Sequence, residues 1–518
     1  MVKLLLLFCL VGFEPFEIDE QIISTPELLE RIQRLEENPI NINRATKQEL
    51  MLIPYIDNLL SESIIDYREE KPFTNISELL LIERITPLLL DRIRPYITVE
   101  IKRPKVAILR GVKLLSRFER KVDDSQNKVY NRLEIPYKGV SISGVLEKDY
   151  EEDDYFDYYA GSIYSPGNFV IGDYDLDIGM GLIFSKPDFF YAGSGIIPGE
   201  RGFSPHLSTY EENYQRGAAL EWRNVTLFGS FIETSDYGEE KLIGASYKFH
   251  PFRITGAIDD YGIEDMSRAT LLSLYMDKDL AGNLMRFEIA TGGSVLQDMR
   301  ENIAYSLGID NGKGLKAIYA SIPANIPTLR NSPFNKNEEA LYLHFEKKII
   351  PSVSTALYSE LTRENSPLSE FERLIGFQMQ WNPLKGLSLY GRLKTTEERD
   401  GLRLDLTYRK YNLNIRNRFE VVNTDGGSGF LAYTGIRYSA DYILETRFIF
   451  YETNNWDSRI YEYENGLPGT FTIKQLSGSG RRIYLILAEK VLPLKGYLKW
   501  GMDFKDGVHH NIGLAVVL

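Results

Sequence analysis

The sequence predicts a mainly β protein, a large antiparallel transmembrane β-barrel preceded by a small all-α domain. From about residue 104 to Leu518, apolar and polar residues alternate with the period of a strand. Tyr, Phe and Trp make up 12% of the 518 residues and there are 41 glycines, which is typical of strands joined by many turns. At roughly 17 residues for each strand and its connection, this stretch holds about two dozen strands.

The chain opens with the features of a secretory signal. Lys3 supplies a positive charge, and an apolar run follows from Leu4 to Phe13. We expect residues 1–13 to be the signal peptide and residues 14–38 to form a short helix and a linker. The alternative is a buried N-terminal strand or helix. Cys9 is the single cysteine and lies in the apolar run, so cleavage would leave a mature chain without cysteine.

A small helical domain is expected from residue 39 to residue 103. Thr46 and Glu49 have the spacing of a capping box, which starts a helix. A second helix is expected to begin around Asp57, and Thr86-Pro87 gives an N-cap followed by a first-turn proline. The same unit, a capped helix, a tight turn and a second helix, therefore occurs twice.

These residues resemble the tandem helix-hairpin-helix domain of competence-type DNA-binding proteins. In that family each hairpin carries a Gly-apolar-Gly turn, whose backbone N–H groups can approach a DNA phosphate. This chain has Tyr55-Ile56-Asp57 and Arg84-Ile85-Thr86 at the two turns. The resemblance rests on residues 40–50, 64–69, 72–73 and 92–97.

The replaced glycines argue against phosphate binding. The side chains of Asp57 and Thr86 can cap the helices that follow them and would fill the place of the phosphate. Residues 39–103 contain nine Lys or Arg and ten Asp or Glu, so the domain lacks the positive charge of a DNA-binding module. We expect a structural or protein-contact role, with a periplasmic protein as the partner. Binding to nucleic acid is the alternative.

The predicted barrel strands carry apolar residues on one face and charged residues on the other. Residues 402–409, for example, alternate Leu or Tyr with Arg, Asp or Thr. Short turns such as residues 222–225 alternate with long polar stretches such as residues 454–480, an asymmetry typical of outer-membrane barrels. The last strand, Asn511 to Leu518, resembles the C-terminal signal for outer-membrane barrel assembly. That resemblance implies membrane lipid and the barrel assembly machinery as partners.

Two motifs, Gly172 to Leu182 and Tyr210 to Ala219, resemble a barrel family of Bacteroidetes-like bacteria with an N-terminal helix-hairpin-helix domain. That family has no settled biochemical activity. Ser185 to Glu212 is too long and too rich in glycine for a hairpin, so we expect this segment, or the helical domain, to obstruct the lumen. The motifs also supply a candidate lumenal charge network, formed by Asp173, Asp177, Glu211 and Arg216. The alternative is that these are ordinary solvated residues of the lumen.

The sequence shows little that would support catalysis. It contains no P-loop, no Gly-x-Ser-x-Gly elbow and no His-Glu-x-x-His zinc motif. His206 and His344 are the suggestive histidines, and nothing in the sequence pairs either with a nucleophile. The acidic run Glu151 to Asp154 lacks the ligand spacing of a calcium site. We therefore expect no cofactor, no metal site and no enzyme activity.

The predicted function is that of a non-enzymatic outer-membrane β-barrel, acting as a pore, a transport component or an envelope scaffold. The helical domain is expected in the periplasm, where it would make protein contacts. Two alternatives stay open. In one, the helical domain binds DNA or takes part in DNA uptake, which the net charge of −13 disfavours. In the other, the barrel contains a hydrolase site.

Overall fold

The computed structural model describes residues 35, 39–82, 85, 87–99, 112–123, 126–150, 158–185, 196–207, 214–234, 238–261, 268–294, 302–326, 333–366, 369–440, 442–468, 470–491, 494–505 and 508–518. The expected signal peptide and nearly all of the linker that follows it lie outside these residues. Within the described ranges, no helix is both long enough and apolar enough to cross a membrane.

The helical domain begins at the capping box that the sequence predicts. The Glu49 N–H donates to the Thr46 hydroxyl (3.2 Å), and the Thr46 N–H donates to the Glu49 carboxylate (2.7 Å). The domain consists of α2 (Lys47–Met51), α3 (Asn58–Glu70), α4 (Pro87–Ile93), two 3₁₀ helices (Ile76–Leu81 and Arg94–Tyr96) and a parallel strand pair, β1 (Ile40–Asn41) with β2 (Ile97–Thr98).

Each helix of the domain contributes apolar side chains to one hydrophobic core. Leu50 of α2, Ile64 of α3 and Ile93 of α4 are completely buried in it. Ile56 and Ile85, at the centres of the two hairpin turns, belong to the same cluster. The helical domain therefore has a core of its own, distinct from the apolar clusters of the barrel.

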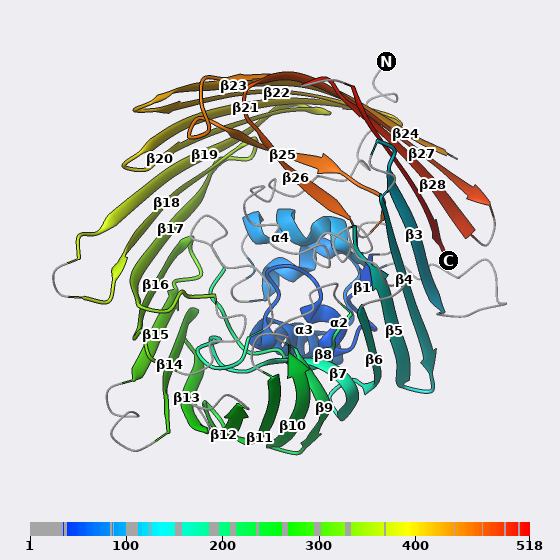
Figure 1. The fold of residues 1–518 in the computed structure, drawn as a ribbon. Helices are drawn as coiled ribbons and strands as arrows, with labels where there is room; N and C mark the ends of the chain where they lie inside the picture. Colours follow the sequence, from blue (N-terminus) through cyan, green and yellow to red (C-terminus); the bar gives the residue numbers. More distant parts are fainter. Residues whose placement is uncertain are drawn as a thin grey trace.

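Among the described residues, 24 antiparallel strands close into one barrel, which confirms the predicted fold and strand number (Figure 1). The last strand pairs with the first, with Val517 opposite Leu115, so the sheet has no free edge. The strands are β3 (Lys113–Lys121), β4 (Gln126–Tyr137), β5 (Val140–Lys148), β6 (Tyr158–Ser165), β7 (Phe169–Asp177), β9 (Gln215–Trp222), β10 (Val225–Thr234), β11 (Gly238–Phe249), β12 (Phe252–Tyr261), β13 (Ala269–Leu280), β14 (Asn283–Gly293), β15 (Ile303–Asp310), β16 (Leu315–Ile322), β17 (Glu338–Ile350), β18 (Val353–Glu364), β19 (Glu372–Leu384), β20 (Leu387–Thr395), β21 (Arg399–Lys410), β22 (Leu413–Thr424), β23 (Gly427–Ser439), β24 (Tyr442–Thr453), β27 (Ser479–Val491), β28 (Leu494–Asp503) and β29 (His509–Val517).

The outer face of the barrel is apolar and the inner face is charged. On β21, Leu402 and Leu404 are 41% and 49% exposed, whereas Arg403 and Asp405 are 2% and 4% exposed. In a soluble protein the apolar side chains are mostly buried and the charged side chains are mostly exposed. A closed sheet satisfies its backbone hydrogen bonds internally, and apolar side chains on its outside face lipid. The alternation read from the sequence is therefore that of a transmembrane barrel.

The two ends of the barrel differ in their connections. Two-residue turns such as Arg223-Asn224 and Pro351-Ser352 join strands at one end, while longer connections such as residues 454–478 lie at the other. Strand β3 begins at the end with the short turns, and β29 finishes there. The connection from the helical domain to the barrel is therefore made at the short-turn end.

Three parts of the chain occupy the lumen. Figure 1 shows α2, α3 and α4 inside the ring of strands, and α4 contacts the wall at β17. The chain after β7 turns inward and forms β8 (Gly202–Pro205), which pairs with the end of β7. The hairpin of β25 (Ile460–Asn465) and β26 (Phe471–Leu476) enters from the long-connection end.

The helical domain lies inside the barrel, where charged side chains of the inner wall pair with it (Figure 1). Its expected location on the periplasmic side stays a prediction. The expectation that the domain or Ser185 to Glu212 obstructs the lumen agrees with the structure for the described residues. Ile197 and Phe203 of that segment belong to the same buried apolar cluster as Phe228 and Tyr275 of the inner wall.

Candidate functional site: a lumen closed by the helical domain

The first contact between the helical domain and the barrel lies at the start of α3. One Asp57 carboxylate oxygen, Oδ1, accepts a hydrogen bond from the Leu60 N–H (2.7 Å) and caps the helix. The other, Oδ2, lies 3.0 Å from Nη2 of Arg286 on β14. The N-terminus of this helix is thus filled by the chain's own carboxylate and by a guanidinium of the wall.

Arg286 joins three parts of the molecule at this point. Its side chain is 2% exposed, and Nη1 donates to the Ile197 carbonyl in the inward segment (2.8 Å). Nε lies 3.4 Å from Oδ1 of Asp277 on the neighbouring strand β13. A buried guanidinium must be paired to be tolerated, and here the helical domain supplies one of its partners.

A second contact holds the other end of the helical domain. Arg92 of α4 forms a buried ion pair with Glu346 of β17, and its guanidinium lies 5.1 Å from the centre of the Tyr55 ring. Nε2 of His344 lies 3.2 Å from the same Glu346 carboxylate. Tyr55 itself has φ +71°, a left-handed conformation that suits glycine. Tyr55 therefore has a backbone conformation that a glycine at this position would adopt without strain.

The predicted hairpin residues have different roles in the structure. Asp57 lies at the contact with the wall, and Tyr55 lies beside Arg92, which pairs with the wall. Ile56 and Ile85 are buried in the helical core. Arg84 and Thr86 lie outside the described residues. Sequence reasoning missed Arg92, Arg286 and Glu346, because the sequence marks which wall residues point inward but not which of them faces the helical domain.

Of the four residues of the predicted network, Asp173 and Arg216 pair with each other, and Arg216 is on the same side of β9 as Leu220 and Trp222, which are 47% and 65% exposed. Nε of Arg216 lies 2.6 Å from Oδ1 of Asp173, whose Oδ2 accepts a hydrogen bond from the Gly161 N–H (2.7 Å). The pairing of β6 with β7 ends at Ser162 and Gly172. Just beyond it, the Asp173 carboxylate accepts the Gly161 hydrogen bond that a backbone carbonyl of β7 would accept in a continued ladder. Asp177 lies apart from this pair and is 3.8 Å from Arg201. Glu211 lies outside the described residues.

The Gly-Met-Gly motif holds a carboxylate of the wall. Glu288 of β14 is completely buried and accepts hydrogen bonds from the N–H groups of Met180 (2.6 Å) and Leu182 (3.2 Å). Gly179 has φ +75°, and a Cβ there would lie 2.6 Å from the Glu288 carboxyl carbon. The glycine is needed for this close approach, so the motif anchors the inward segment to the wall.

The two histidines singled out from the sequence make packing contacts. Nδ1 of His206 lies 2.6 Å from Oδ1 of Asp175, and the imidazole stacks on Tyr214 at 4.5 Å between ring centres. His344 pairs with Glu346, as described above. Over the described part of the chain, no group of three or more His, Cys, Asp or Glu side chains is arranged to hold a metal ion.

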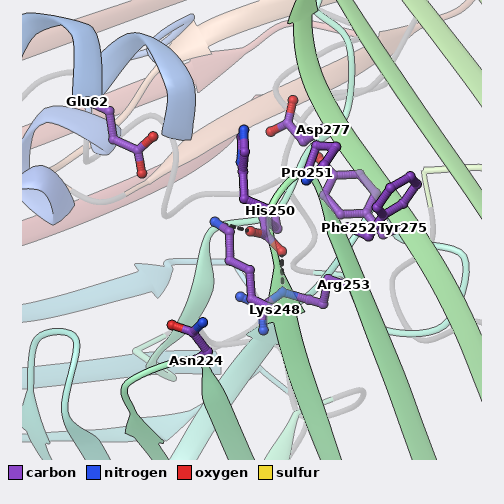
Figure 2. Close-up of a pocket in the computed structure, with 10 residues that line it drawn as sticks. Glu62, Asn224, Lys248, His250, Pro251, Phe252, Arg253, Tyr275 and Asp277 are labelled. Carbon is purple, nitrogen blue, oxygen red and sulfur yellow. Dashed lines mark hydrogen bonds and ion pairs between the residues drawn. The ribbon is translucent and has the colours of Figure 1, made fainter.

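A cavity of about 260 Å³ lies between the helical domain and the short-turn rim (Figure 2). Within it Glu200, from the inward segment, pairs with Lys248 (3.1 Å) and Arg253 (2.7 Å). Burial alone would raise the pKa of Glu200, but the two cations outweigh it and hold the pKa below its usual value. The lining residues are Glu62, Glu200, Asn224, Lys248, His250, Pro251, Phe252, Arg253, Tyr275 and Asp277.

Comparisons with known proteins match the helical domain. The helix-hairpin-helix motif family matches residues 36–98. The endonuclease/exonuclease/phosphatase family domain-containing protein 1 of Rattus norvegicus and that of Mus musculus are each 38% identical over 66 residues. These matches span 12% of this chain and 12% of each relative.

Solved barrels resemble the rest of the chain only distantly. The translocation pore of the P pilus usher PapC is 10% identical, with a TM-score of 0.41, over 78% of this chain and 98% of the usher chain. OpdL of Pseudomonas aeruginosa is 9% identical, with a TM-score of 0.32, over 79% of this chain and 97% of its own. At such scores no function is inferred from these barrels.

Proposed function

We propose that this chain is an outer-membrane β-barrel whose lumen is closed by its own helical domain, and that it acts without enzymatic chemistry as a gated pore or transport component. The observation that carries the proposal is the docking of the helical domain through the pairs Asp57–Arg286 and Arg92–Glu346. A barrel of this size leaves an aqueous channel unless something fills it. Here the filling element is a separately folded domain.

The topology supports a periplasmic partner for the helical domain. Short turns of outer-membrane barrels lie in the periplasm, and the chain joins the helical domain to β3 at the short-turn end. A periplasmic protein could therefore reach the helical domain from the side on which it is tethered. We propose such a protein as the partner that releases the plug.

The contacts at the interface favour a plug that is stable but releasable. Removing one partner of a buried ion pair costs about 3–5 kcal/mol because the other charge is left unpaired, so a substitution at either pair should weaken docking. The helical domain keeps a hydrophobic core of its own, and its described strands, β1 and β2, form a two-stranded sheet separate from the barrel. The domain could therefore leave the lumen without opening the barrel.

Planar-bilayer conductance tests the proposal. The intact protein should show small conductance, and deletion of residues 39–98 should raise it to large, steady steps. Glu78→Gln is the control, because Glu78 bonds only to Thr74 on the exposed surface of the same domain among its described contacts. Heat-modifiable migration on gels would verify that each barrel is closed. An intact barrel with unchanged conductance after the deletion would contradict the proposal.

DNA binding is the second candidate, and the match to the helix-hairpin-helix motif family is the observation that favours it. Asp57 opposes it, because the carboxylate and Arg286 fill the phosphate position at α3. We expect the full-length protein in detergent to bind duplex DNA weakly at both low and high salt. Tight binding with a steep salt dependence would make DNA uptake the leading function.

A further inference from the structure

Three separate parts of the chain enclose the cavity between the helical domain and the short-turn rim (Figure 2). Glu62 comes from α3 of the helical domain, Glu200 comes from the inward segment, and the other lining residues belong to the barrel wall and its short turns. Asn224 and His250 are exposed, so solvent reaches the cavity from the short-turn end. Pockets for drug-sized ligands measure roughly 300–1,000 Å³, so a cavity of about 260 Å³ suits a smaller solute.

One side of this cavity is acidic. Glu62 and Asp277 both lie in the upper part of Figure 2. Oδ2 of Asp277 and the hydroxyl of Tyr275, on the same face of β13, are buried and form no hydrogen bond of ordinary geometry within the described part of the chain. The other Asp277 oxygen shares Arg286 with Asp57. Because buried polar atoms without hydrogen bonds are unfavourable, a solute that donates protons here would satisfy groups that the protein leaves unsatisfied.

The opposite side of the cavity is basic. Lys248 and Arg253 pair with the buried Glu200 carboxylate at 3.1 and 2.7 Å, so two cations share this anion. The Lys248 ammonium has three donors, one of which bonds to Glu200, and its side chain is 34% exposed. Asn224, whose carbonyl accepts the Lys248 backbone N–H (2.8 Å), adds a side-chain amide to the lining. A solute carboxylate could therefore accept hydrogen bonds on this side.

Charges of both signs in one small cavity disfavour a simple ion. A lone cation beside Asp277 would also meet Lys248, and a lone anion beside Lys248 would also meet Glu62, so each gains one attraction and one repulsion. A zwitterion can direct its ammonium to the acidic side and its carboxylate to the basic side. Pro251 and Phe252 add apolar surface to the lining, which suits methylene groups between the two charges.

We propose that this cavity binds a small zwitterionic solute in which methylene groups separate an ammonium from a carboxylate, with the ammonium at Glu62 and Asp277 and the carboxylate at Lys248. Because the lining comes from both the helical domain and the wall, the complete site exists only while the domain is docked. A ligand that binds one state alone stabilises that state. The bound zwitterion therefore holds the plug in the lumen, a consequence that rests on the proposed gating function.

The test is isothermal titration calorimetry of the full-length protein in a non-ionic detergent, with 4-aminobutanoate as the probe. Butanoate and butylammonium are the comparators, because each has the same chain length and keeps one of the two charges. The wild type should bind 4-aminobutanoate saturably and about tenfold more tightly than either comparator. No saturable binding of 4-aminobutanoate, or equal affinity for the three compounds, would overturn the site.

Lys248→Gln tests the basic side. The variant should bind 4-aminobutanoate about tenfold more weakly but butylammonium no more weakly, since Glu200 keeps its pair with Arg253. Lys241→Gln is the matched control, because Lys241 lies on the same strand, is exposed and pairs with Glu239 (3.1 Å). Equal losses for the two variants would contradict recognition of the carboxylate by Lys248.

Glu62→Gln tests the acidic side from the helical domain. It should weaken 4-aminobutanoate and butylammonium about threefold without affecting butanoate, because Glu62 is partly exposed and its charge is partly screened. Glu69→Gln, an exposed position on the same helix, is the control. A folding defect would weaken all three ligands equally, so the opposite selectivity of the two cavity variants separates charge recognition from loss of structure.

The effect on the plug is measured separately, as the open probability of single channels. Arg92→Gln breaks the other contact of the helical domain, so this variant should open more often than the wild type. Addition of 4-aminobutanoate should lower its open probability. Saturable binding without this decrease would overturn the link to gating. Because calorimetry does not measure conductance, a failure of the site and a failure of the gating proposal are distinguishable.

Discussion

Asp57 of the helical domain caps helix α3 with one carboxylate oxygen and pairs with Arg286 of the barrel wall through the other, at 2.7 and 3.0 Å. The residue stands where the competence-type domains that the sequence resembles carry the second glycine of the hairpin turn. This one residue therefore caps the helix and at the same time supplies an attachment to the barrel. The start of α3 is thus an internal contact of the molecule.

Two substitutions at Asp57 should separate capping from docking. Asn caps helices about as well as Asp, so Asp57→Asn should lose mainly the pair with Arg286, at a cost of about 3 kcal/mol. Asp57→Ala should also lose the cap, for about 1 kcal/mol more. Thermal unfolding in detergent would measure both effects. Equal stability of the two variants would show that the cap contributes nothing.

The inward turn of β7 should depend on Gly172. It has φ +107°, and a Cβ there would lie 2.1 Å from the Gly161 carbonyl oxygen. Gly172→Ala should destabilise the protein by about 3 kcal/mol or more, through strain and a backbone clash. Gly202→Ala is the control, because Gly202 has φ +83° but open space around its Cβ position.

The control at Gly202 should cost about 1 kcal/mol, from the left-handed backbone alone. Urea unfolding monitored by tryptophan fluorescence would compare the two variants. Similar losses at both positions would show that the close approach of β6 and β7 is not a constraint.

The β25–β26 hairpin should loosen in acid. Burial alone would raise the pKa of Glu464, but Lys499 and Arg482 outweigh it and lower the pKa to about 2. A carboxyl with a depressed folded-state pKa stabilises the protein above its unfolded pKa of about 4.3, and this contribution is lost as pH falls toward 2. The melting temperature should therefore fall over this pH range.

Glu464→Gln provides the comparison for the acid transition. The variant cannot titrate at this position, so its melting temperature should fall less steeply between pH 4.5 and pH 2 than that of the wild type. The difference between the two proteins corresponds to the stability that the ionised Glu464 contributes at neutral pH, on the order of 3 kcal/mol. Parallel curves for the two proteins would mean that Glu464 has no depressed pKa.

The sequence predicted those features that a local pattern encodes. The alternation in residues 402–409 gave both the strand and its lipid-facing side, because side chains of a strand point alternately to its two faces. The Thr46–Glu49 spacing gave the start of α2, because a capping box is completed within four residues. The strand number followed from the length of the alternating region.

Contacts between distant segments could not be predicted in the same way. Arg286 and Asp57 are 229 positions apart in the sequence, and Arg286 resembles any other inward arginine of the wall. Residues 454–480 read as a polar loop, although Glu462 and Glu464 are buried partners of Arg447 and Arg482. A charged residue that is solvated and one that is paired look identical in a sequence. Only the structure therefore shows which segments lie in the lumen and which of their side chains pair with the wall.

The most direct test of the account is a double-mutant cycle between Asp57 and Arg286, read as the open probability of single channels in planar bilayers. Asp57→Asn and Arg286→Gln should each raise the open probability, because each breaks the contact that holds the helical domain in the lumen. The double variant should open little more than the stronger single variant, since residues in direct contact are not additive. Fully additive effects, or no change in any variant, would contradict the central claim that this pair keeps the barrel closed.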